Sequence, residues 1–140
     1  MVFRVHTDLL ERASSVTSDK LDDFISEMEL KWNIEHSPST VVPWGLALWR
    51  AEHFTKAREV LDLCSDHERN NEIYLMLRGL VLRKLPDSVS EAEACFRGAI
   101  ALSPDRADAY YNLGNLLLDR DSFEEAEENY MRCLSIDHMG

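Results

Sequence analysis

The sequence has few cysteines, no long apolar run and few basic residues, and each scarcity excludes a class of protein. Three cysteines (Cys64, Cys95 and Cys133) are too few for a disulfide framework, which a chain of 140 residues does not need to bury a core. No apolar stretch approaches the roughly 20 residues of a membrane-spanning helix. Residues 1–14 also lack the uninterrupted apolar segment of a signal peptide. We therefore expect a soluble, cytoplasmic protein.

Basic residues are outnumbered, because 15 Lys and Arg stand against 26 Asp and Glu and give a net charge of −11. Such a charge opposes binding to nucleic acid and to anionic membrane surfaces, so we expect neither as a partner. The excess is concentrated in residues 107–140, which carry 8 acidic and 2 basic side chains. A partner with a basic end is expected to direct that end towards this region, near Asp108 and Asp119.

Catalytic motifs are also missing. The sequence contains no nucleophile-elbow serine, no Walker phosphate loop and no helical zinc-peptidase motif. Cys64 and His67 are one helical turn apart, but two ligands without a second pair do not make a zinc site. We therefore predict no catalytic residue, no metal, no cofactor and no enzyme activity.

Small residues recur at a nearly constant interval. The glycines at this interval are Gly45, Gly79 and Gly114, which are 34 and 35 residues apart. The alanines are Ala57, Ala92 and Ala126, which are 35 and 34 residues apart, and each is followed four positions later by Leu61, Phe96 or Tyr130. A fixed period in this range indicates stacked structural repeats. The pattern predicts three units at residues 38–71, 72–106 and 107–140, preceded by a segment at residues 1–37.

Each unit is predicted to contain two helices joined by a turn, because two apolar stripes of helical spacing flank a polar break. A glycine inside a helix costs about 1 kcal/mol relative to alanine, so packing must compensate for Gly114. We infer that the missing side chain lets the second helix lie close, with Ala126 as the residue that Gly114 meets. Cys64 and Cys133 occupy a small packing position and are expected to be buried.

These residues resemble the tetratricopeptide repeat family, in which Leu-Gly follows an aromatic residue and Ala precedes a second aromatic residue. The third unit matches this pattern best through Tyr110, Leu113, Gly114, Ala126 and Tyr130. It departs from the pattern where His138 replaces the usual proline and Leu117 replaces an aromatic residue. The resemblance covers residues 38–140 and implies an all-α fold, a right-handed superhelical stack of helix-turn-helix hairpins.

The segment at residues 1–37 lacks the repeat pattern. We expect one helix at residues 7–16 and a second after Thr17 and Ser18, whose side chains are suitable N-caps. Phe24, Met28 and Trp32 form an apolar stripe on the second helix. Two interpretations remain open: these helices cap the first repeat, which we favour, or they occupy the binding groove of the array.

The family resemblance implies a concave groove, lined by the first helix of each unit, that binds a peptide or a single helix. The residues at the groove positions are Val42, Leu46, Trp49, Arg50, Met76, Leu77, Leu80, Arg83, Lys84, Tyr111, Asn112, Asn115 and Asp119. Trp49 is the expected main anchor. Val42, Leu46, Leu77 and Asp108 stand where a clamp for chaperone carboxyl termini would need Lys and Asn, so that ligand is not expected.

The predicted function is therefore that of a scaffold or adaptor, which binds a peptide or amphipathic helix of a partner protein in the groove. The alternative is an accessory module of a larger polypeptide or enzyme assembly, with its groove filled by its own N-terminal helix.

A further expectation concerns the C-terminal edge. Leu117, Tyr130 and Leu134 are expected to lack support there, so this edge is predicted to meet a chain continuation or another copy in a homodimer.

Overall fold

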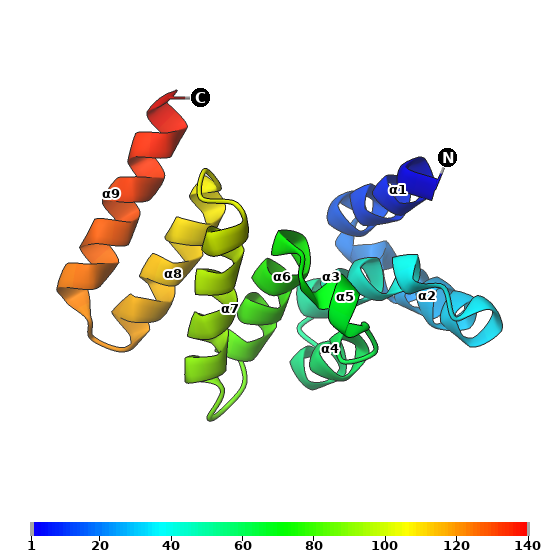
Figure 1. The fold of residues 1–140 in the computed structure, drawn as a ribbon. Helices are drawn as coiled ribbons and strands as arrows, with labels where there is room; N and C mark the ends of the chain where they lie inside the picture. Colours follow the sequence, from blue (N-terminus) through cyan, green and yellow to red (C-terminus); the bar gives the residue numbers. More distant parts are fainter. Residues whose placement is uncertain (1, 140) are drawn as a thin grey trace. The chain divides into compact units, whose positions relative to one another are not determined.

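The computed structural model describes residues 2–139, with the side chains of residues 9–137 (Figure 1). All regular elements in this range are helical, which confirms the all-α prediction. They are α1 (Val2–Ser15), η1 (Ser18–Lys20), α2 (Leu21–Glu35), η2 (Pro38–Thr40), α3 (Val41–Arg50), α4 (Phe54–Leu61), α5 (Asp66–Arg69), α6 (Glu72–Arg83), α7 (Val89–Leu102), α8 (Ala107–Asp119) and α9 (Phe123–Met139). The chain divides into two compact units, residues 1–69 and residues 70–140.

The first unit is organised around α3, which packs against α1, α2 and α4. Most of α3 is apolar, and its Trp44 and Leu48 are only 4% and 3% exposed. A helix with apolar residues on most of its circumference requires neighbours on several sides. Phe24 and Met28 of α2 supply part of that cover, since both are buried. The N-terminal helices are therefore part of the hydrophobic core of this unit.

The N-terminal helices differ in detail from the prediction. Helix α1 begins at Val2, before the expected residue 7. Thr17 stands at the N-cap of η1, a short 3-10 turn before α2, but its side chain makes no capping hydrogen bond. The predicted cap at Thr17 is therefore wrong, because the extra turn separates it from the first residues of α2.

The second helix of the first repeat is short. Helix α4 ends at Leu61, so Cys64 lies beyond it, although its side chain is buried as expected. Ser65 and Glu68 form a reciprocal cap of the short helix α5, in which the Ser65 amide donates to Glu68 Oε1 at 3.0 Å. Arg69 Nε donates to the Cys64 carbonyl at 3.0 Å. This local network competes with continuation of α4 and ends it early.

The second unit contains two helix hairpins, α6 with α7 and α8 with α9, and α7 packs against α8 (Figure 1). Helix α6 begins at Glu72 because Asn71 caps it, accepting hydrogen bonds from the amides of Ile73 and Tyr74. The shared core is almost entirely apolar and includes Phe96 and Leu113, which are 0% and 1% exposed.

A glycine faces an aromatic ring in each hairpin of the second unit. A methyl carbon placed on Gly79 would lie 2.5 Å from Cε1 of Phe96, and one placed on Gly114 would lie 2.8 Å from Cε1 of Tyr130. Real side chains do not approach so closely, so only glycine permits this helix spacing. The inferred close approach at Gly114 is thus supported, but the residue nearest to it is Tyr130. Ala126, the expected neighbour, does not contribute any of the three nearest atoms.

The turns between paired helices repeat a backbone conformation as well as a sequence position. Glu52, Asp87 and Asp121 have φ values of 64°, 58° and 61° in these turns. After α3, the amide of His53 also donates to the Leu48 carbonyl at 2.8 Å, which is the Schellman arrangement. The left-handed conformation costs a non-glycine residue about 1–2 kcal/mol. The fixed turn geometry directs each second helix back along the first.

The cysteines follow the sequence prediction only in part. Cys64 and Cys95 are buried, but Cys133 is partly exposed, so its expected burial is wrong. Cys133 lies on α9, whose outer side has no neighbouring element within the described part of the second unit. Burial raises the pKa of the Cys95 and Cys133 thiols above the ordinary value, so neither is an activated nucleophile.

Replacing either close-packed glycine with alanine should destabilise the protein. We expect Gly79→Ala and Gly114→Ala each to lower the free energy of unfolding by about 1–3 kcal/mol, because the added methyl group displaces an aromatic ring. Urea unfolding followed by circular dichroism measures this change.

Gly98→Ala on α7 is the matched control. Its methyl group would lie 3.3 Å from Leu75 Cδ1, the end of a flexible side chain. The gain in helix propensity, up to about 1 kcal/mol, should then make this variant as stable as the parent or more stable. Equal stability of the Gly114→Ala and Gly98→Ala variants would contradict the glycine–aromatic contact.

Candidate functional site

The groove positions on α3 are only partly open in the first unit. Val42, Leu46, Trp49 and Arg50 each have intermediate exposure. Arg50 Nη1 donates to the Ala13 carbonyl of α1 at 2.8 Å, which satisfies one of the carbonyls at the end of that helix. A predicted groove residue is thus already engaged by the N-terminal segment.

Trp49 is packed more tightly than a displayed anchor would be. Its indole Nε1 is buried and has no hydrogen-bond partner among the described residues. The residue as a whole is partly exposed, so only part of the ring is open to a partner. The groove positions on α3 therefore offer a peptide less exposed surface than the sequence predicts.

The groove positions on α6 separate into a buried and an open set. Met76 and Leu77 are 6% and 4% exposed, so their predicted role as lining residues is wrong, because both side chains belong to the hydrophobic core. Leu80 and Arg83 are partly exposed, and Lys84 is exposed. Only the last turn of α6 presents the predicted surface.

An ion pair joins the open parts of α6 and α8. Arg83 Nε donates to Asp119 Oδ2 at 2.8 Å, so two predicted groove residues that lie far apart in the sequence meet. Tyr111 on α8 is 52% exposed, whereas Asn112 and Asn115 have intermediate exposure. Apolar, amide and charged side chains of α6 and α8 are therefore exposed or partly exposed in the same compact unit.

Tyr130 forms a hydrogen bond, not predicted from the sequence, to a groove residue. Its hydroxyl donates to Asn115 Oδ1 at 2.5 Å, and its ring lies 5.9 Å from that of Tyr111. Burial, and then the neighbouring Tyr111, raise the pKa of the Tyr130 phenol above its ordinary value. Like any tyrosine at neutral pH, it is protonated and can donate. Because the bond to Asn115 fixes which way the amide oxygen faces, it also fixes the direction of the Nδ2 group, which can donate.

We call the residues Leu80, Arg83, Tyr111, Asn115 and Asp119 the α6/α8 face. It combines partly exposed apolar groups with one oriented amide donor, an arrangement suited to holding a peptide. Within the residues that the structure describes, no group of three or more His, Cys, Asp and Glu side chains is placed to hold a metal. The face contains no cysteine, serine or histidine that would serve as a nucleophile or general base.

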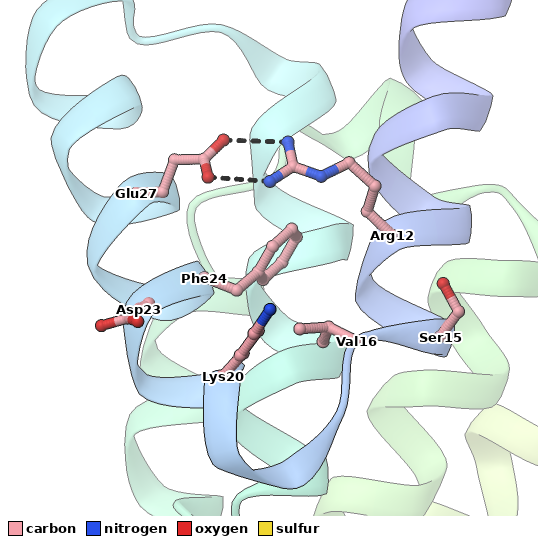
Figure 2. Close-up of a pocket in the computed structure, with 7 residues that line it drawn as sticks. All are labelled: Arg12, Ser15, Val16, Lys20, Asp23, Phe24 and Glu27. Carbon is pink, nitrogen blue, oxygen red and sulfur yellow. Dashed lines mark hydrogen bonds and ion pairs between the residues drawn. The ribbon is translucent and has the colours of Figure 1, made fainter.

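A separate pocket lies between α1 and α2 in the first unit, and Figure 2 shows the side chains that line it. The pocket encloses about 320 Å³. Its lining residues are Arg12, Ser15, Val16, Lys20, Asp23, Phe24 and Glu27. The pocket was not predicted from the sequence, because its residues come from α1, α2 and the segment between them, which lack the repeat pattern.

Arg12 bridges the two helices across this pocket. Its guanidinium makes two parallel hydrogen bonds to Glu27, at 2.9 and 2.8 Å, and lies 5.1 Å from the centre of the Phe24 ring (Figure 2). The hydrogen bonds from Arg12 hold the pKa of the Glu27 carboxyl below its ordinary value. The pair therefore joins α1 to α2.

The comparisons with known proteins agree with this architecture. Residues 107–139 match the sequence model of the tetratricopeptide repeat family. Among solved structures, MamA 41-end from Desulfovibrio magneticus RS-1 superposes with a TM-score of 0.81 at 12% identity, covering 96% of this chain and 76% of that chain. A crystal structure of MamA gives 0.75 at 22% identity, with 84% and 69% covered.

These matches confirm the predicted resemblance to the tetratricopeptide repeat family. The chain has the fold of a helical repeat protein, and its third unit is a tetratricopeptide repeat. At such low identities the likeness to MamA establishes the fold alone. No curated protein sequence matches the chain. None of the described helices is both long and apolar enough to cross a membrane.

Removal of the Glu27 carboxylate should have a pH-dependent effect. Because its pKa is lowered on folding, the carboxylate stabilises the protein above the ordinary glutamate pKa of about 4.3 and ceases to do so as the pH falls below that value. We expect Glu27→Gln to lower the melting temperature at neutral pH, by at most the equivalent of about 1 kcal/mol for a pair exposed to solvent.

Thermal melts at a series of pH values test this expectation. The difference between parent and Glu27→Gln should shrink in acid. Glu29→Gln, which removes the same charge from the exposed side of α2, is the control and should show no such trend. A pH-independent difference for Glu27→Gln would mean that the ion pair does not stabilise the unit.

Proposed function

We propose that this protein is an interaction scaffold that binds a peptide or amphipathic helix of a partner protein on the first helices of its repeats. A tetratricopeptide repeat and a helical repeat fold both support a protein-interaction role. The α6/α8 face is the part of the predicted groove that best fits this function, since its residues lie within one compact unit.

The observation that carries the proposal is the orientation of Asn115. The bond from the Tyr130 hydroxyl fixes how the amide faces, and the Nδ2 group can donate to a main-chain carbonyl of a bound peptide. Leu80 and the half-exposed Tyr111 lie on the same face and fit an apolar side chain. The main-chain bond would fix the peptide, and the apolar contact would contribute most of the affinity.

The charged residues contribute less than the sequence suggests. Asp108 is paired with Arg106 at 2.9 Å, and Asp119 is paired with Arg83 at 2.8 Å. A basic peptide end would have to compete with these arginines for both carboxylates. Exposed ion pairs are worth about 0–1 kcal/mol each, so such competition would add little affinity.

A second candidate function is an accessory module whose first-unit groove is filled by its own N-terminal helices. The bond from Arg50 to the Ala13 carbonyl and the packing of α1 and α2 against α3 favour this reading for the first unit. In that case Trp49 belongs to the core, and peptide binding is confined to the α6/α8 face. Both candidates therefore make the same prediction for that face.

Peptides selected from a random display library against the 140-residue chain provide the probe. We expect Leu80→Ser combined with Tyr111→Ser to weaken their binding by about tenfold or more, because the apolar anchor is lost. Tyr130→Phe keeps the ring against Gly114 but frees Asn115 to rotate, and it should weaken binding about fivefold, the value of one hydrogen bond.

Leu102→Ser is the control, since Leu102 is 42% exposed at the end of α7, outside the α6/α8 face. This variant should bind the selected peptides as the parent does. Circular dichroism confirms that each variant is folded. Selected peptides that bind folded Leu80→Ser/Tyr111→Ser with undiminished affinity would refute the proposed face.

A further inference from the structure

Helix α9 carries an exposed apolar stripe that the α6/α8 face does not use. Phe123, Met131 and Leu134 are 62%, 60% and 55% exposed. They are eight and three residues apart, a spacing that places them on one side of a helix. We call them the α9 stripe.

The stripe borders the side of α9 that packs inside the unit, since Phe123 and Leu134 are seven and four residues from Tyr130, but its three side chains are exposed. Ala126 is buried and Tyr130 contacts Gly114, so these residues face α8, which lies along one side of α9 in Figure 1. Leu117, which was expected at an unsupported edge, is only 3% exposed. The stripe is therefore formed by Phe123, Met131 and Leu134, without Leu117.

Carboxylates lie beside the stripe at its Phe123 end. A hollow of about 510 Å³ lies beside Phe123 and is lined by Asp121, Ser122, Phe123, Glu124, Glu125 and Glu128. Glu125 is paired with Arg97, but no ion pair joins Glu124, Glu127 or Glu128 to any other residue that the structure describes. Glu124 favours the start of the helix through the helix dipole, whereas Glu127 and Glu128 lie beyond the first turn.

We propose that the α9 stripe is a docking surface for a basic amphipathic helix of another protein. An apolar face on such a helix would cover Phe123, Met131 and Leu134. Flanking Lys or Arg side chains would pair with the carboxylates that have no ion-pair partner at present. This is the helix-on-helix mode of recognition, and it uses a surface outside the proposed peptide site.

Charge favours this occupant over a second copy of the chain. Helix α9 has five carboxylates and one arginine, and the whole chain has a net charge of −11. Moreover, Arg132 is already placed 5.8 Å from the centre of the Tyr110 ring. Stacking two α9 helices would bring two acidic sets together, and like charges at an interface oppose association.

Two synthetic peptides of about 16 residues, long enough for helical structure, test the proposal. Both carry the same leucine and alanine face, but one has a lysine polar face and the other a glutamate polar face. We expect the 140-residue chain to bind the lysine peptide, measured by fluorescence anisotropy at physiological ionic strength, and not the glutamate peptide.

Substitutions locate the binding surface. Met131→Ser combined with Leu134→Ser should weaken binding of the lysine peptide about tenfold or more, because the apolar contact is lost. The control is Leu30→Ser combined with Ile34→Ser, which removes two side chains that are 60% and 71% exposed on α2. This control should bind as the parent does.

Three results would overturn the proposal. They are equal binding of both peptides, an equal loss in the α2 control, and no binding of the lysine peptide at all. Sedimentation of the chain alone adds a fourth: a dimer that Met131→Ser/Leu134→Ser dissociates would assign the stripe to a second copy. Because the α6/α8 face is unchanged in these variants, display-selected peptides should still bind them, which separates this test from that of the proposed function.

Discussion

The contact between a helical glycine and an aromatic ring of the paired helix is the constraint on which the second unit depends. Gly79 receives Phe96 and Gly114 receives Tyr130, and a single methyl group at either glycine would collide with the ring. The close approach lets the two helices of a hairpin share one core. The glycine–aromatic contact also fixes how each helix is rotated about its axis. It therefore determines which residues of α6 and α8 are exposed to solvent.

The same contact connects packing to recognition. Tyr130 places its ring against Gly114 and its hydroxyl on Asn115, so the residue that closes the last hairpin also orients the amide of the α6/α8 face. Phe96 closes the preceding hairpin without a hydroxyl. The third repeat therefore offers an oriented hydrogen-bond donor, whereas the second repeat has no hydroxyl at the same position. We infer that peptide specificity is concentrated in the third repeat.

Much of the fold could be predicted from the sequence because repeated small residues report helix contacts directly. The glycine and alanine periods identified the hairpins, and α6 and α8 begin at the predicted unit boundaries. The sequence pattern did not show where α4 ends. The Ser65–Glu68 cap of α5 competes with continuation of α4, which ends before Cys64. The site was predicted least well, since register alone cannot show that Met76 and Leu77 are buried or that Tyr130 reaches Asn115.

The central claim is that peptide binding occurs on the α6/α8 face. Amide chemical-shift changes on titrating a display-selected peptide into the isotopically labelled chain test it most directly. We predict shifts centred on Leu80, Tyr111 and Asn115, with a change at the Asn115 side-chain amide as it donates to the peptide. Shifts confined to α2, α4 or α7, with Asn115 unaffected, would contradict it.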